Sequence, residues 1–251
     1  MLPGVCLFDG DAARAASGSA PWLVELGVDD HLTRSLFTTG KSRTALWDAG
    51  CSIILRSNLS LHDLRAGFRK ITQFYDDQLA KWVFLRFWDP RFARYLLAYG
   101  STEIRLRMLG VGPMMMQGAE VNEVQIWTLP DAFRDIRTQC PFRLRAQDHH
   151  ALKLVRLDDF VTRVLTWLRS TYGGLPVGID ERRFILELTM HARDVLKLKT
   201  ERTVSDYIAA SWLLRMPAER HLDMSPRRHE IPQATLARIH DMAYEIFEAN
   251  S

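Results

Sequence analysis

The chain has 251 residues, 47% of them hydrophobic, which is enough to bury one large core or two smaller ones and argues against a disordered protein. Lys and Arg (33) nearly balance Asp and Glu (30), so the formal charge of +3 argues against a dedicated nucleic-acid binder. Cys6, Cys51 and Cys140 lie far apart without a CxxC pair, which argues against a zinc ribbon and a disulfide framework and is typical of reduced cytosolic thiols.

The N-terminal sequence, MLPGVCLFDGDAARAA, lacks the basic segment and the long apolar core of a secretory signal. No stretch of the sequence reaches the ~20 apolar residues that are needed to span a bilayer. We therefore expect a cytoplasmic protein without stable membrane insertion.

Strand-like and helix-like segments alternate through the first half of the chain. Short apolar runs with the length and composition of strands occur at residues 5–8, 21–26 and 52–56. After the third run, Ser60 and Asp63 form a capping-box pattern, and Leu64, Phe68 and Ile71 then recur at helical spacing. The alternation favours a mixed α/β layer in which helices cover a sheet.

Residues 82–91, WVFLRFWDPR, combine a strand, a corner and a helix start. The aromatic and β-branched residues of the first half predict a strand that is largely buried, including Trp82 and Trp88. Asp89 can cap a helix, and Pro90 suits its first position because it has a fixed φ and no N–H to satisfy. We expect this helix to continue to about residue 99.

The middle of the chain, residues 101–148, is less regular. The sequence VQIWTL at residues 124–129 predicts a strand, and PMMMQG at residues 113–118 predicts a loop or an edge strand. Methionine is typical of adaptable binding surfaces, although a run of methionines is more often core filling. Our candidates for partner contact are Met114, Met115, Met116 and Trp212.

The last hundred residues have the periodicity of helices. Apolar stripes precede Gly173, follow Asp180 and end the chain, and Thr203 with Asp206 forms another capping-box pattern. We therefore predict an α/β (mixed α+β) N-terminal lobe, residues 1–148, with a sheet covered by helices. An all-helical C-terminal lobe, residues 149–251, follows it.

No local motif predicts catalysis. Gly40-Lys41-Ser42 resembles the end of a phosphate-binding loop, but Ser35 stands where that loop needs a glycine. His229-Glu230 lacks the second histidine of a metalloprotease helix, because residue 233 is Gln233. We predict no catalytic residue, no cofactor site and no metal ligand, while a site assembled by the fold from distant residues stays open.

An ordered series of segments carries a family resemblance. It comprises CLFDGDAA from Cys6, APWLVEL from Ala20, an LF-containing helix around Leu36, SIILRS from Ser52, SLHDLRAGFRK from Ser60 and FLRFWDPRFARYLL from Phe84. In this order the segments resemble the adaptor or chaperone family of bacterial type VI secretion systems, often called Tap or Tec proteins. The family's motif is an aromatic strand followed by Tyr or Trp and Asp-Pro-Arg, which Trp88, Asp89, Pro90 and Arg91 reproduce.

The resemblance spans residues 4–127 and implies a protein that is not an enzyme and needs no cofactor. Its partners would be a cognate effector toxin, bound through the toxin's N-terminal region, and the VgrG spike, onto which the toxin is loaded in the cytoplasm. We expect the helical lobe to help form a groove for an apolar toxin segment. Family members generally have a further strand and helix before the position of Cys6, so the resemblance implies either a shortened start or a fragment.

Two other functions compete with the adaptor. One is an enzyme, a hydrolase or a nucleotide-using protein, with a site assembled from distant residues; a deep polar pocket with convergent titratable groups would favour it. The other is a regulatory nucleic-acid binder, which the near-neutral charge disfavours.

Overall fold

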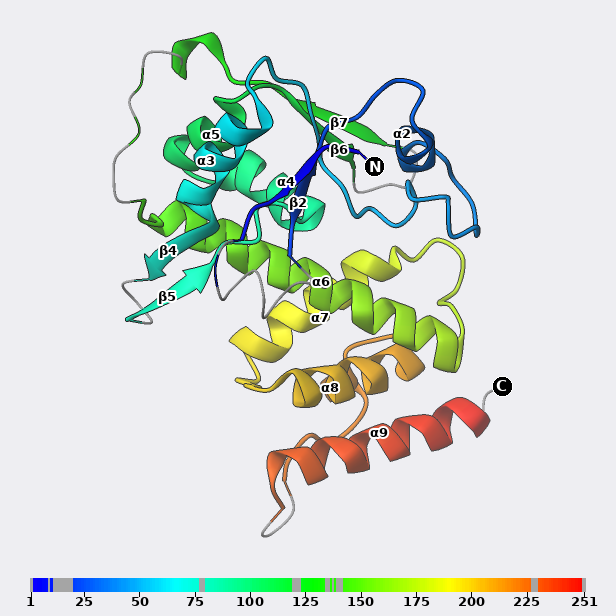
Figure 1. The fold of residues 1–251 in the computed structure, drawn as a ribbon. Coiled ribbons are helices and arrows are strands. Elements are labelled where there is room, and N and C mark those ends of the chain that lie inside the picture. The colour runs from blue at the N-terminus through cyan, green and yellow to red at the C-terminus, as the bar shows by residue number, and fades with distance from the viewer. Residues whose placement is uncertain are drawn as a thin grey trace. The chain divides into compact units, whose positions relative to one another are not determined.

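The computed structural model describes residues 2–8, 10, 20–76, 80–118, 123–133, 136, 138, 142–226 and 230–249 (Figure 1). Two of the residues discussed above, Cys140 and His229, lie outside these ranges. The chain forms two compact units, Met1–Val155 and Arg156–Ser251. This division and the lobe boundary predicted at residues 148/149 both fall within one long helix, α6 (Ala146–Tyr172).

Short antiparallel strands build the sheets of the N-terminal unit. Strand β1 (Gly4–Cys6) pairs with β2 (Trp22–Val24), and β4 (Gln73–Asp76) pairs with β5 (Lys81–Phe84). A three-stranded sheet has the order β3 (Ile54–Leu55), β6 (Met114–Gln117), β7 (Val124–Trp127). The predicted α+β class is confirmed, but in the part of the chain that the structure describes the strands form three small sheets instead of one.

The helices of this unit are α2 (His31–Leu36), α3 (Leu61–Thr72), α4 (Pro90–Tyr99), α5 (Thr102–Leu109) and the short 3₁₀ helix η1 (Asp131–Phe133). At the start of α3 the predicted capping pattern is confirmed: Ser60 Oγ accepts from the Asp63 N–H (3.1 Å) and donates to Asp63 Oδ2 (2.7 Å). Helix α5 is an addition to the predicted elements. It begins at Ser101, whose Oγ accepts from the Ile104 N–H.

A buried carboxylate ties the start of α5 to the start of α6. Asp148 has no exposed surface. Its carboxylate accepts from the N–H (2.7 Å) and the Oγ (3.0 Å) of Ser101 and from the N–H of Arg145 (2.9 Å). The single side chain of Asp148 accepts from all three donors. Its loss would therefore leave these polar groups without their acceptor.

The core of the N-terminal unit includes two of the three methionines that we considered for partner contact. Strand β6 is the central strand of its sheet, so alternate side chains point inward, and Met114 and Met116 are almost completely buried among helix and strand residues. The interpretation as a loop or edge strand is therefore wrong for β6. Only Met115 keeps part of its surface, so Met114 and Met116 fill the core.

In the C-terminal unit the described elements are the later part of α6, α7 (Glu181–Asp194), α8 (Glu201–Leu214), the 3₁₀ helix η2 (Ala218–Arg220) and α9 (Pro232–Ala249). The Asp180 carboxylate caps α7 by accepting from the Arg183 N–H (3.0 Å). Helix α8 is capped by Thr200, which accepts from the Thr203 N–H (3.2 Å). The cap predicted at Thr203 is therefore wrong by three residues, because a second threonine stands one turn earlier.

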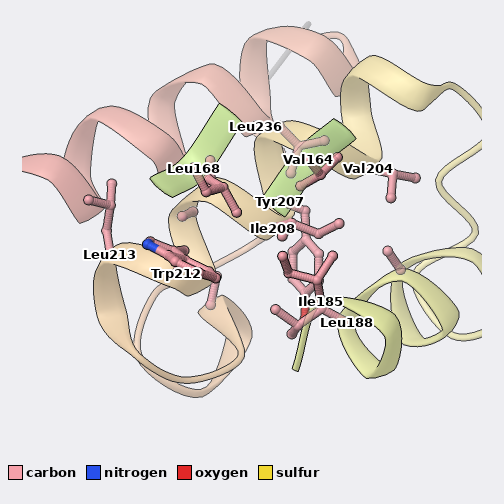
Figure 2. Close-up of a cluster of buried hydrophobic side chains, with 14 of the residues drawn as sticks. Val164, Leu168, Ile185, Leu188, Val204, Tyr207, Ile208, Trp212, Leu213 and Leu236 are labelled. Atoms are coloured by element: carbon pink, nitrogen blue, oxygen red, sulfur yellow. The ribbon is translucent and has the colours of Figure 1, made fainter. Parts of the chain in front are cut away.

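Helix α8 runs through the centre of this core. Its residues 207–213 are all buried, and Figure 2 shows Tyr207, Ile208 and Trp212 packed among side chains of the neighbouring helices. The Trp212 side chain is only 3% exposed, and its Nε1 donates to the carbonyl of Gly173 (3.2 Å). Trp212 is thus a core residue with a satisfied indole N–H, which leaves little surface for partner contact. Within the described residues, no helix combines the length and the apolar character needed to cross a lipid bilayer.

Candidate partner-binding surface

The Asp-Pro-Arg corner is held by a network around Asp89. The Asp89 carboxylate accepts from the N–H of Arg91 (3.1 Å), which caps α4, and Pro90 occupies the first helical position as predicted. The same carboxylate pairs with the Arg91 guanidinium (2.9 Å) and with Arg86 Nη2 (3.1 Å). Arg86 also lies over the ring of Phe92, 5.3 Å from its centroid.

These contacts explain the residue types of the motif. The Asp89 side chain is only 10% exposed, and both of its oxygens are used by the cap and by two guanidinium groups. Trp88 packs against Phe87 at 5.4 Å and against Phe8 at 5.5 Å between ring centroids. The motif therefore fixes the corner between β5 and α4.

The hairpin of β4 and β5 carries aromatic side chains on one exposed face. Its register pairs Tyr75 with Trp82 and Gln73 with Phe84, so these four residues share a face. Tyr75 is 38% exposed, Trp82 64% and Phe84 46%. The rings of Tyr75 and Trp82 meet edge to face at 5.8 Å. We call Tyr75, Trp82 and Phe84 the aromatic row.

The expectation that residues 82–88 form a largely buried strand is wrong for Trp82 and Phe84. Strand β5 ends at Phe84, and the hairpin of β4 and β5 packs only its other face against the core, where Phe74 and Val83 lie. On that face Phe74 is buried, and Leu85 and Phe87 continue the inward positions. The outward positions 82, 84 and 86 end with Arg86. Arg86 alternates with Trp82 and Phe84, and a charged residue at one of these alternating positions was the sequence signal that the face is exposed.

A cavity lined mostly by apolar residues lies next to Trp88, and ring contacts through Phe8 connect Trp88 to the aromatic row. The rings of Phe84 and Phe8 are 5.0 Å apart, and Phe8 contacts Trp88. Trp88 in turn lines a cavity of about 190 Å³. The other lining residues are mostly apolar and include Leu7, Trp22, Leu23, Phe68 and Met114.

The segment that contains the aromatic row is basic. Residues 61–99, from α3 to α4, contain seven Lys or Arg and four Asp, a net charge equal to the +3 of the whole chain. Of the four acids, Asp76 is buried and the Asp89 side chain is 10% exposed. The side chains of Arg86 and Arg91 are both more than half exposed. Both of these exposed guanidinium groups pair with Asp89, so they belong to the corner network.

Polar clusters in the C-terminal unit link its helices. The Tyr207 hydroxyl donates to Glu219 (2.8 Å), whose other carboxylate oxygen lies 2.9 Å from Nε2 of His191. Burial, and then the hydrogen bond to Glu219, raises the pKa of Tyr207 above its ordinary value. The Tyr172 hydroxyl lies 2.8 Å from Nε2 of His240. Burial also raises the pKa of Tyr172, and these tyrosines stay neutral hydrogen-bonding groups at pH 7.

The residues that could ligate a metal do not gather in the described parts of the chain: no group of three or more His, Cys, Asp or Glu has a suitable arrangement there. Cys6 and Cys51 are free thiols, and Cys51 lies at the cavity. Neither Met115 nor the corner residues Asp89, Pro90 and Arg91 line the cavity, whereas Trp88 and Met114 do. The structure thus brings together two residues that sequence reasoning named separately.

A comparison with known families matches residues 2–106 to the family described as a domain of unknown function, DUF4123. The matched segment contains the corner, the aromatic row and all of the cavity lining except Met114. No curated protein and no solved structure matches the chain. Residues 2–106 are therefore the part of the chain that is similar to DUF4123, and they contain the corner and the aromatic row.

Proposed function

We propose that the chain is a cytoplasmic adaptor or chaperone that binds a cognate toxin effector of a type VI secretion system and helps to load it onto the VgrG spike. The observation that carries this proposal is the match of residues 2–106 to DUF4123. It covers the ordered segments, from CLFDGDAA to FLRFWDPRFARYLL, that resemble type VI adaptors.

The geometry of the matched segment supports protein binding. Asp89 and Arg91, the charged residues of the motif, are used to build a corner. The aromatic row of the same segment is exposed next to that corner. Exposed aromatic side chains that cluster on one face are typical of protein–protein contact sites, where they supply large contact areas at a small cost in side-chain entropy.

Co-expression tests the proposal. The full chain would be tagged and produced with the toxin and the VgrG protein encoded beside it, and separately with a type VI toxin from an unrelated gene cluster. We expect a stable complex with the neighbouring toxin and none with the unrelated one. Failure of the chain to retain either neighbouring protein, when all three are folded by circular dichroism, would overturn the proposal.

A further inference from the structure

A second cavity lies in the helical unit, between the C-terminal ends of α8 and α9. Figure 1 shows the two helices running in the same direction, and residues from the last turn of each line the cavity. Its volume is about 190 Å³. We call it the α8–α9 pocket. Its lining consists of five apolar and two basic residues: Leu213, Leu214, Met216, Ile246 and Phe247, with Arg215 and His221.

The lining of the α8–α9 pocket changes from buried apolar to exposed basic residues. Leu213 is only 4% exposed, and Leu214 is half-buried. Arg215 and His221 are both exposed, so they belong to the rim. A dry apolar cavity of roughly 150 Å³ in another protein takes up benzene. The pocket therefore has room for one branched or aromatic group.

The two basic side chains at the rim have no partner in the described parts of the chain. Arg215 and His221 form hydrogen bonds there only through their backbone N–H groups. The carboxylate of Glu219, which lies between them in sequence, accepts from Tyr207 and contacts His191. Both rim side chains are therefore available to a ligand.

The other acids of this region do not line the pocket. The Asp223 carboxylate accepts from the N–H of Ser225 (2.9 Å). Glu245 and Glu248 adjoin the two lining residues of α9 in sequence, but neighbouring positions on a helix do not share a face. A ligand in the pocket therefore meets two basic groups and no carboxylate among the lining residues.

The backbone of Arg215 also indicates a role for its side chain. Arg215 is the C-cap residue of α8 and has left-handed torsion angles, φ 58° and ψ 22°. Glycine adopts this conformation with less strain and ends helices in the same way. An arginine in this position is favoured only if its side chain contributes something that glycine lacks, such as a cation at the helix end or an anion-binding group.

We infer that the α8–α9 pocket binds a carboxylate that carries one branched or aromatic group, with the apolar group inside and the carboxylate at Arg215 and His221. A guanidinium binds a carboxylate through two parallel N–H···O bonds. A free carboxylic acid and the C-terminal residue of a polypeptide both present this chemistry. The inference goes beyond the proposed toxin binding and does not depend on it.

Binding to the full chain is measured by ligand-observed NMR titration with isocaproate and with its uncharged amide. A short peptide that ends in leucine, with a free or an amidated C-terminus, represents the polypeptide source. Arg215→Gly is compared with Lys197→Gly, because both replace a basic residue of left-handed φ in this unit and only Arg215 lines the pocket. Met216→Trp narrows the pocket, and Met216→Leu keeps its size.

We expect isocaproate to bind at least about tenfold more tightly than its amide, because only the acid offers a charge-assisted pair. Arg215→Gly should weaken this binding at least about tenfold, and Met216→Trp several-fold. Lys197→Gly and Met216→Leu should bind like the parent chain. Both glycine variants should melt at least as high as the parent chain, because each removes backbone strain.

The inference fails if neither the acids nor the peptide bind, if acid and amide bind equally well, or if Arg215→Gly binds like Lys197→Gly. A lower melting temperature of Arg215→Gly with unchanged binding would assign the side chain to the helix end alone. Tighter binding of the free-carboxylate peptide than of isocaproate supports a polypeptide terminus as the ligand, and the reverse order supports a free acid. None of these results bears on whether the chain binds the toxin.

Discussion

Helix α8 and the β4–β5 hairpin are both rich in large apolar side chains, yet they expose them very differently. In α8 the residues from Tyr207 to Leu213 are all buried, since the neighbouring helices cover the helix on every side. In the hairpin, Trp82 and Phe84 stay exposed because only the opposite face, which carries Phe74 and Val83, packs against the core. The number of covering elements, and not the hydrophobicity of the stretch, therefore decides which aromatic side chains are free for a partner.

The sharpest test of this contrast exchanges the two tryptophans for alanine. Trp212→Ala removes a buried indole together with its hydrogen bond to Gly173, so we expect a loss of about 4 kcal/mol in the free energy of unfolding. Trp82→Ala should change it by only about 0.5 kcal/mol. Urea denaturation of both variants measures these values. Similar losses for the two would contradict the contrast between a buried Trp212 and an exposed Trp82.

The stability of the N-terminal unit should depend strongly on the buried carboxylate of Asp148. Asp148→Ala leaves the N–H and Oγ of Ser101 and the N–H of Arg145 without their acceptor, so we expect a loss of about 3 kcal/mol. Asp148→Asn keeps one acceptor oxygen and should cost roughly half as much. Urea denaturation followed by circular dichroism gives both values. A fully stable Asp148→Ala protein would show that α5 and α6 hold together without this contact.

At the corner, Asp89→Ala removes the cap of α4 and both arginine contacts. We expect it to cost about 1.5 kcal/mol, because the side chain is mostly buried but its partners are half exposed. Asp89→Asn keeps a cap acceptor and should cost less. Thermal unfolding of the two variants measures the order, and a larger loss for Asp89→Asn would contradict the capping role.

The smallest effect concerns pH in the helical unit. Burial raises the pKa of Asp206 above its ordinary value of 3.8, although Arg202 and His240 oppose the shift. Since the pKa is higher in the folded than in the unfolded chain, this carboxyl reduces stability as the pH rises through its raised pKa. Asp206→Asn should therefore raise the melting temperature slightly at pH 7 and leave it unchanged below pH 3.8. An equal effect at both pH values would exclude this origin.

The sequence was most informative where one residue type has one local role. The caps at Ser60, Asp89 and Asp180 all lie where the spacing of polar and apolar residues predicts them. These contacts are local, so neighbouring residues suffice to predict them. The α+β class followed from the same alternation of short apolar runs and helical stripes.

Features that depend on distant parts of the chain were missed. Helix α5 is only eight residues long, and its polar residues Glu103, Arg105 and Arg107 blur the apolar spacing. Burial of Met114 and Met116 depends on strands on both sides of β6, and the exposure of Trp82 depends on which face of the hairpin the rest of the fold covers. The cavity joins residues from Leu7 to Met114, so only the fold brings them together.

Hydrogen exchange of the chain with and without the neighbouring toxin tests the central claim most directly, because it reports every segment in one measurement. The account predicts that toxin binding slows exchange at β4, β5 and residues 20–24 beside the cavity, while α8 exchanges at the same rate in both samples. Protection confined to α7, α8 and α9, with the hairpin unchanged, would contradict it.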